Sequence, residues 1–247
     1  MIMREVTVAM ESGVNPINSL GGGSRDNFTL VGKENAKFTD NADDFYLPPS
    51  VHEKLKGINI QTYNELKDYF SKMGLSLSSE EEELENEYAA VQLPTIRKMG
   101  AQLIAAVETF KETFGKDALK SLKGFILFAK NVPGQASYTA ILNGEEPNGR
   151  EGYIRIRNFH TSGHDIFHEF VHAFQDSVKK KGEDILGSSE RLNKAAGILP
   201  RQKAYMFHVE AHREAERMAE AVADGFCLGD KDGLDFIKRL RAVVRRG

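Results

Sequence analysis

The pattern of apolar and polar positions changes in character at about residue 95. From there on, apolar residues recur at helical spacing over 96–114, at Met99, Leu103, Val107, Phe110 and Phe114. Three short segments with an apolar or alternating pattern follow and predict strands at 124–129, 137–142 and 153–157. Two more helical patterns come after them, at 163–176 and 212–226. This order of elements predicts an α+β domain over residues 96–247.

Residues 1–95 have a weaker pattern and predict a mainly helical or irregular N-terminal region of unknown function. Residues 1–45 mix Gly with Asn, Asp and Lys, which is typical of a linker. Pro48, Pro49 and Ser50 indicate the start of a short helix, and a second helical pattern over 63–73 ends at Gly74. Ser78 and Ser79 precede four glutamates, which predicts a further helix start there because acidic residues favour helix N-termini.

Composition excludes several classes of protein. The net charge of −3 comes from well-mixed signs, so nucleic acid is not expected as the main partner. No apolar run approaches 18 residues, which predicts no membrane span, and the N-terminus lacks the apolar stretch of a signal peptide. Cys227 is the only cysteine, which excludes an internal disulfide and zinc sites built from several cysteines. We therefore expect a cytoplasmic protein, or one exported without a classical signal peptide.

One motif in the helical segment 163–176 carries chemistry: His168-Glu169-Phe170-Val171-His172. Two imidazoles four residues apart on a helix lie about 40° apart around its axis, so both can point at one cation. Glu169 lies about 100° from His168, where its carboxylate can reach a water on that cation without binding the metal. A zinc ion so held lowers the pKa of its water to about 7, and the carboxylate takes the proton during attack on a carbonyl. Thr161 and Ser162 are the expected helix caps.

A catalytic zinc site needs a third protein ligand, and the helix 212–226 offers two carboxylates for it. Glu220 has apolar neighbours on both sides, so we expect it to be buried and to need a cation. Glu216 lies one turn earlier on the same face and is the alternative ligand, with Glu220 then holding a ligating histidine. Asp224, one turn after Glu220, could accept the spare N–H of a ligating histidine; otherwise it is a helix-end residue before Gly225.

The motif His168-Glu169-x-x-His172 followed by Glu220-x-x-x-Asp224 resembles the gluzincin branch of the zincin metallopeptidases. The resemblance covers roughly residues 96–230. It implies a zincin-like core, a Zn²⁺ cofactor held by His168, His172 and Glu220, and Glu169 as the general base. It further implies that Asp224 orients His168 and that His212 or Tyr205 stabilises the transition state. The substrate would be a protein or peptide, and the strand at 153–157 would lie at the sheet edge above the cleft.

Other interpretations of the same residues stay open. His208 and His212 are also four residues apart and could form a second metal pair, or lie on the surface. His164 shares the face of His168 and is expected in a capping or supporting role. A metzincin would need a glycine and a third histidine soon after His172, and 173–181 contains neither.

The alternative function is a phage-particle component or a secreted effector or structural protein that carries a zincin-like module, latent or inactive. A third possibility is that residues 1–95 are a pro-segment covering the cleft. The sequence does not indicate the oligomeric state.

Overall fold

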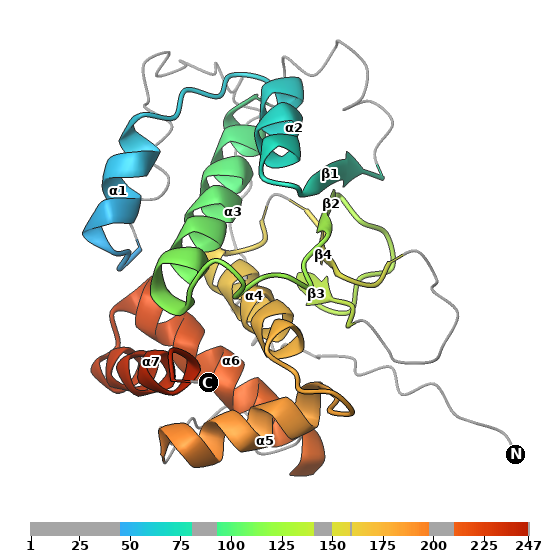
Figure 1. Cartoon of the computed structure of the whole chain (residues 1–247). Coiled ribbons are helices and arrows are strands. Elements are labelled where there is room, and N and C mark those ends of the chain that lie inside the picture. Colours follow the sequence, from blue (N-terminus) through green and yellow to red (C-terminus); the bar gives the residue numbers. More distant parts are fainter. Residues whose placement is uncertain (1–44, 81–92, 141–149, 159, 198–209, 247) are drawn as a thin grey trace, which may run out of the picture.

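The computed structural model describes residues 45–80, 93–140, 150–158, 160–197 and 210–246. These residues form seven helices and one small mixed sheet, which confirms the α+β class (Figure 1). In chain order, the elements are α1 (Pro49–Lys56), α2 (Tyr63–Lys72), β1 (Ser76–Ser79), α3 (Leu93–Phe114), β2 (Gly124–Leu127), β3 (Ala136–Tyr138), β4 (Tyr153–Ile156), α4 (Gly163–Ser177), α5 (Ile185–Ala196), α6 (Glu210–Leu228) and α7 (Lys231–Val244).

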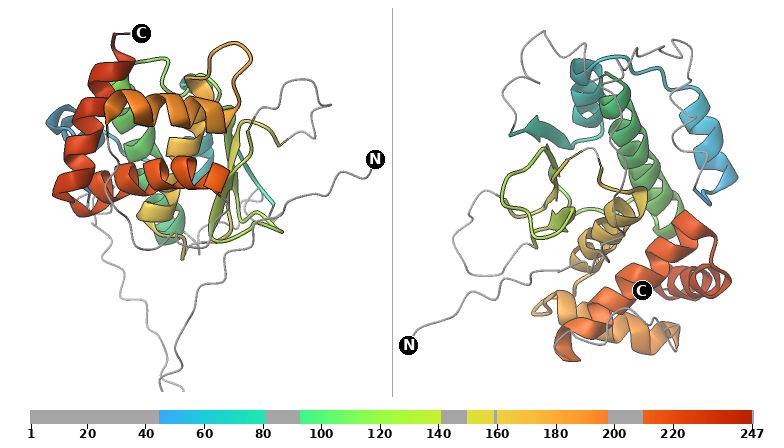
Figure 2. Two further views of the ribbon diagram at one scale, coloured as in Figure 1. Left: turned by 90° about the horizontal axis from the view of Figure 1, so that it is seen from below. Right: turned by 180° about the vertical axis from the view of Figure 1, so that it is seen from behind.

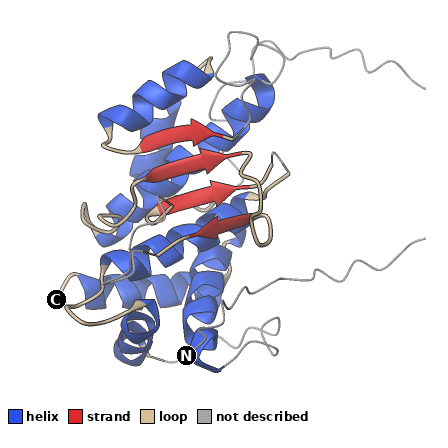
Figure 3. Ribbon diagram, turned by 90° about the vertical axis from the view of Figure 1, so that its right-hand side faces the viewer, coloured by secondary structure: helices blue, strands red, loops and turns tan. Residues whose placement is uncertain are grey.

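The four strands lie in the order β1-β2-β4-β3 (Figure 3). β1, β2 and β4 are parallel, and β3 runs antiparallel to β4 at the end of the sheet. The sequence predicted that β4 would be the edge strand before the motif helix, and this is wrong: β4 lies between β2 and β3. The edge strand on this side of the sheet is β3, which packs beside α4.

The helices gather on one side of the sheet and share an aromatic core with it (Figure 2). Phe110 of α3 is fully buried at the centre of this core. Its ring contacts Phe167, Phe170 and Phe174 of α4 at centroid distances of 6.3, 5.8 and 6.2 Å, and Phe226 of α6 at 6.0 Å. Packing of these rings fixes one face of α4 against α3, and so directs the motif histidines toward α6.

Part of the N-terminal region belongs to the same core. Phe45 packs against Phe167 of α4 at 5.2 Å, and a Cβ atom at Gly163 would collide with the Phe45 ring. The amide of Tyr46 donates to the carbonyl oxygen of Phe226 at 2.7 Å. Residues 45–47 therefore touch both helices that carry the motif residues. Whether 1–95 and 96–247 act as separate domains stays a prediction.

The structure at Ser78 and Ser79 differs from the sequence prediction. These residues end β1 rather than begin a helix, and they pair with Ile126 and Leu127 of β2. Leu75 and Leu77 are buried beside them, so tertiary pairing overrides the local capping pattern. The glutamates at 81–83 and the linker-like residues 1–44 lie outside the described residues.

The motif helix α4 begins as expected. The hydroxyl of Ser162 accepts from the amide of Asp165 at 3.1 Å, and the Asp165 carboxylate accepts from the amide of Ser162 at 3.1 Å. This reciprocal capping box satisfies two amides that a helix start leaves without partners.

α6 ends at Leu228, followed by Gly229 with a φ of +66°. Within the described parts of the chain, no helix is both long and apolar enough to cross a membrane.

Candidate metal centre

Three histidines of α4 face three carboxylates of α6 in a ladder. His164, His168 and His172 follow one another at intervals of four residues, and so do Glu216, Glu220 and Asp224. A step of four residues advances about 6 Å along a helix, so each row follows one face of its helix. His172 lies near Glu216 and His164 near Asp224, which shows that the two helices run antiparallel at this contact.

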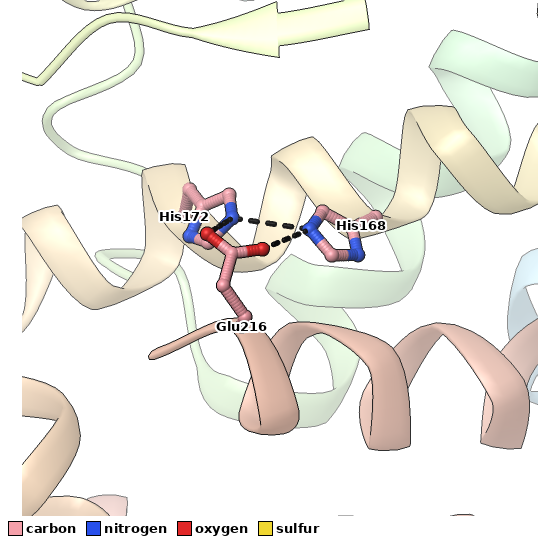
Figure 4. A group of neighbouring side chains, drawn as sticks. All are labelled: His168, His172 and Glu216. Atoms are coloured by element: carbon pink, nitrogen blue, oxygen red, sulfur yellow. Dashed lines mark hydrogen bonds and ion pairs between the residues drawn. The ribbon is translucent and has the colours of Figure 1, made fainter. Parts of the chain in front are cut away.

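One end of the ladder brings together two histidines and one carboxylate (Figure 4). The Nε2 atoms of His168 and His172 are 3.2 Å apart. The carboxylate of Glu216 reaches between them from α6, with Oε2 3.1 Å from Nε2 of His168 and Oε1 3.5 Å from Nε2 of His172. His168 is buried, and the other two side chains are partly buried.

The spacing of these atoms fits a metal ion of zinc size. Bonds of 2.0–2.1 Å at tetrahedral angles separate neighbouring ligand atoms by about 3.3 Å. The two nitrogens are 3.2 Å apart, and each lies 3.1 or 3.5 Å from a different oxygen of the Glu216 carboxylate. Imidazole nitrogens with a carboxylate oxygen are also a donor set that suits zinc. His168, His172 and Glu216 can therefore hold a metal ion.

The other ring nitrogen of each histidine is held by a neighbouring side chain. Nδ1 of His168 lies 3.1 Å from Oε2 of Glu220, and Nδ1 of His172 lies 2.8 Å from Oε1 of Gln175. Both acceptors favour a proton on Nδ1, which leaves the lone pair of each Nε2 directed at the shared position. Gln175 is itself fixed, because its Nε2 donates to the carbonyl oxygen of Ala215 at 3.0 Å.

Electrostatics favour positive charge at this position. Burial by itself lowers the pKa of His168, but hydrogen bonds to Glu216 and Glu220 outweigh it and raise the pKa to about 10. Burial also lowers the pKa of His172, and Glu216 again more than offsets this, so the pKa rises. Burial acts to raise the pKa of Glu216, yet the two histidines bring it well below its usual range. The surrounding carboxylates thus favour positive charge at the two imidazoles, and a divalent cation can supply that charge in place of protons.

Glu169 projects toward the edge strand rather than toward the two Nε2 atoms. Its Oε2 accepts from the backbone amide of Tyr138 in β3 at 2.6 Å. Hydrogen bonds to β4 use the carbonyl of Gln135 and the amide and carbonyl of Thr139. In an antiparallel pair the residues between these, Ala136 and Tyr138, turn their backbone groups away from the partner strand. Glu169 therefore reaches from the motif helix to the outward edge of β3.

The predicted site residues fall into three groups. The structure brings together His168, His172 and Glu216, while Glu220 contacts His168 on the opposite side of the ring. Asp224 contacts His164, with 3.0 Å between Oδ1 and Nε2, so the expected contact to a ligating histidine is made by Glu220 instead. Tyr205 and His208 lie outside the described residues, and His212 lies in α6 with its side chain undescribed, so their predicted roles stay predictions.

Gln175 was missed by the sequence analysis. It lies three residues after His172, which is the spacing at which two side chains meet on one helix face. It is also a fully buried amide in the helix α4. A buried amide needs hydrogen-bond partners, and that requirement was the available signal.

The site must be interpreted from its own geometry. Comparisons with models of protein families, with curated proteins and with solved structures give no match to this chain. What the structure supports directly is a His/Glu cluster able to hold a metal ion, on two packed helices beside the edge of a small mixed sheet.

Proposed function

We propose that the chain is a zinc-dependent peptidase whose metal is held by His168, His172 and Glu216. The observation that carries the proposal is the arrangement of two Nε2 atoms and one carboxylate at 3.1–3.5 Å, each histidine being oriented through its Nδ1 atom. The assignment of Glu216 replaces Glu220, which the sequence favoured. In this arrangement Glu220 orients His168, the role that the sequence gave to Asp224.

Zinc in such a site supplies a Lewis acid that acidifies a bound water and polarises a carbonyl group. Glu169 supplies the base. It lies on the same helix as both histidines, next to His168 in sequence, and its carboxylate faces the outward edge of β3. Its charge also helps to raise the pKa of both histidines, which supports a place for this carboxylate near the metal position.

The edge of β3 supports a peptide rather than a small molecule as the substrate. An extended chain can add to an exposed strand edge through main-chain hydrogen bonds. Ala136 and Tyr138 offer such groups, and the amide of Tyr138 is already in use by Glu169. A substrate that pairs with Tyr138 would release the Glu169 carboxylate from this amide, so that substrate binding and availability of the base are linked.

Hydrolysis of fluorescently labelled casein by the full chain tests the proposal, with zinc content measured on the same preparations. Glu169→Gln should keep its zinc and its fold while losing at least about 100-fold in activity, because the amide cannot accept the proton. Glu53→Gln is the matched control, since Glu53 is exposed on α1 and pairs only with Lys56 among the contacts described for it. Equal activity in Glu169→Gln and in the control would overturn the proposal. Zinc binding without hydrolysis would favour the structural or effector alternative.

A further inference from the structure

The far end of the ladder holds a second group of potential ligands. It consists of His164 from α4 with Glu220 and Asp224 from α6, and one donor atom from each lies within 4.8 Å of the other two. All three side chains are partly buried. None of the three is among the proposed zinc ligands, so this group is a separate feature of the same helix pair.

The distances describe a wider position than the first one. Nε2 of His164 lies 3.0 Å from Oδ1 of Asp224 and 3.9 Å from Oε1 of Glu220. Ligand atoms around a cation with bonds of 2.0–2.1 Å stand about 3.3 Å apart at tetrahedral angles, a value between these two. Movement of Oε1 of Glu220 toward His164 would bring these two donors to that separation, with Oδ1 of Asp224 already beside His164.

Charge also favours a cation at this end. Glu216, Glu220 and Asp224 repeat every four residues on one face of α6, a spacing at which like charges repel each other. A divalent metal on His168, His172 and Glu216 would balance the charge at the first end. At the other end, two carboxylates face one imidazole, and a second divalent cation would balance both.

Glu220 connects the two positions. Oε2 accepts from Nδ1 of His168, while Oε1 is the atom that faces His164. One carboxylate can thus orient a ligand of the first metal and bind the second. Each role uses a different oxygen of the same carboxylate.

We propose that His164, Glu220 and Asp224 form a second divalent-cation site, next to the first and joined to it through Glu220. One imidazole nitrogen with carboxylate oxygens suits zinc and similar transition metals, whereas calcium prefers six to eight oxygens. The wider spacing predicts weaker binding than at the first site. This inference does not depend on peptidase activity, since it concerns only metal binding.

Calorimetric titration of the metal-free full chain with Zn²⁺ tests it, with zinc per chain checked by elemental analysis. The wild-type chain should bind two zinc ions, the second more weakly than the first. His164→Ala and the nearly isosteric Asp224→Asn should each bind one, with the tighter event kept. His52→Ala, on α1, is the control and should bind two. Titration with Ca²⁺ should give no comparable binding.

The variants separate failure of this proposal from failure of the proposed function. The double variant His168→Ala, His172→Ala should keep only the weaker event. One zinc in the wild-type chain, unchanged in His164→Ala and lost in the double variant, would overturn the second site and leave the first intact. The reverse pattern, with zinc lost in His164→Ala and kept in the double variant, would support the second site and overturn the proposed catalytic one.

Discussion

The carboxylate of Glu220 lies 3.1 Å from Nδ1 of His168, on the side of the ring opposite to Glu216. This relationship determines how the two acidic residues divide their roles. A histidine that binds a metal through Nε2 carries its proton on Nδ1, and a carboxylate there fixes both the tautomer and the ring orientation. Glu220 lies where it could take that role, and Glu216 lies on the Nε2 side, where the proposed metal would bind.

Gln175 lies beside Nδ1 of His172 in the same way, so loss of the Gln175 side chain should weaken metal binding. Gln175→Ala removes the acceptor 2.8 Å from Nδ1 and should lower zinc affinity about 10–100-fold, the usual cost of losing such a partner. Gln175→Glu keeps an acceptor at this position and should recover part of the loss. Competition with a chromogenic chelator measures both. Unchanged affinity in Gln175→Ala would mean that His172 is oriented by its packing alone.

Tyr138 ties the edge strand to the motif helix at two places. Its amide donates to Glu169, and its hydroxyl donates to Oδ2 of the buried Asp176 at 2.6 Å. Tyr138→Phe removes the second bond and should lower the free energy of unfolding by about 1.5–3 kcal/mol, the range for hydrogen bonds to charged groups. Denaturant titration measures it.

The matched control for Tyr138 is Tyr153→Phe. The hydroxyl of Tyr153 lies 3.3 Å from the hydroxyl of Ser76 at an exposed position, so its loss should cost less than about 1 kcal/mol. Equal destabilisation by the two substitutions would show that the contact with Asp176 adds nothing particular to the attachment of β3.

The metal-free protein should lose stability as the pH rises above neutral. The pKa of His168 is raised from 6.5 to about 10 in the folded chain, so its ion pairs stabilise fully below pH 6.5 and this contribution disappears as pH approaches 10. The lowered pKa of Glu216 acts in the opposite sense: its contribution is present above its usual value of 4.5 and is lost in stronger acid.

Thermal unfolding of the chelator-treated chain between pH 6.5 and 10 measures the first effect. The melting temperature should fall across this range more steeply in the wild-type chain than in His168→Ala, which lacks the titrating group. Identical pH profiles would show that His168 does not carry the charge assigned to it in the absence of metal.

Truncated chains can test which part of the N-terminal region is needed for the core to fold. Residues 45–79 bury large side chains that include Val51, Leu55, Tyr63, Leu66, Phe70 and Leu77. At about 1.5–3 kcal/mol for each, the cost of their removal is comparable with the whole stability of a typical domain, about 5–15 kcal/mol. A chain lacking residues 1–90 should therefore not unfold cooperatively, whereas one lacking residues 1–44 loses no described core residue and should do so. Circular dichroism melting curves compare them, and a cooperative transition in the shorter chain would show that 96–247 folds alone.

Much of the fold could be predicted because it depends on local periodicity. The helices over 96–114 and 163–176 and the strand at 124–129 carry clear patterns, and the structure has α3, α4 and β2 there. Strand order could not be predicted in the same way. β1 pairs with a strand 48 positions away in register, Ser76 with Gly124, and no local signal at Ser78 or Ser79 indicates this partner. The helices α5 and α7 were not predicted at all.

The candidate site also has a part that local sequence predicts and a part that depends on tertiary contacts. The spacing of His168 and His172 on one helix is enough to predict that they face one cation. The choice between Glu216 and Glu220 depends on how far α6 is shifted along α4, and both residues lie on the same face of α6. Apolar neighbours predicted burial of Glu220 alone, but both side chains are partly buried. The shift between two packed helices is set by their tertiary contacts.

The most direct measurement of the central claim is a crystal structure of the zinc-loaded chain, with anomalous scattering recorded at the zinc absorption edge. We predict a peak about 2.0–2.2 Å from Nε2 of His168, Nε2 of His172 and a carboxylate oxygen of Glu216, with Glu220 remaining on Nδ1 of His168. A peak bound by Glu220 instead of Glu216, or no peak between the two histidines, would contradict the account.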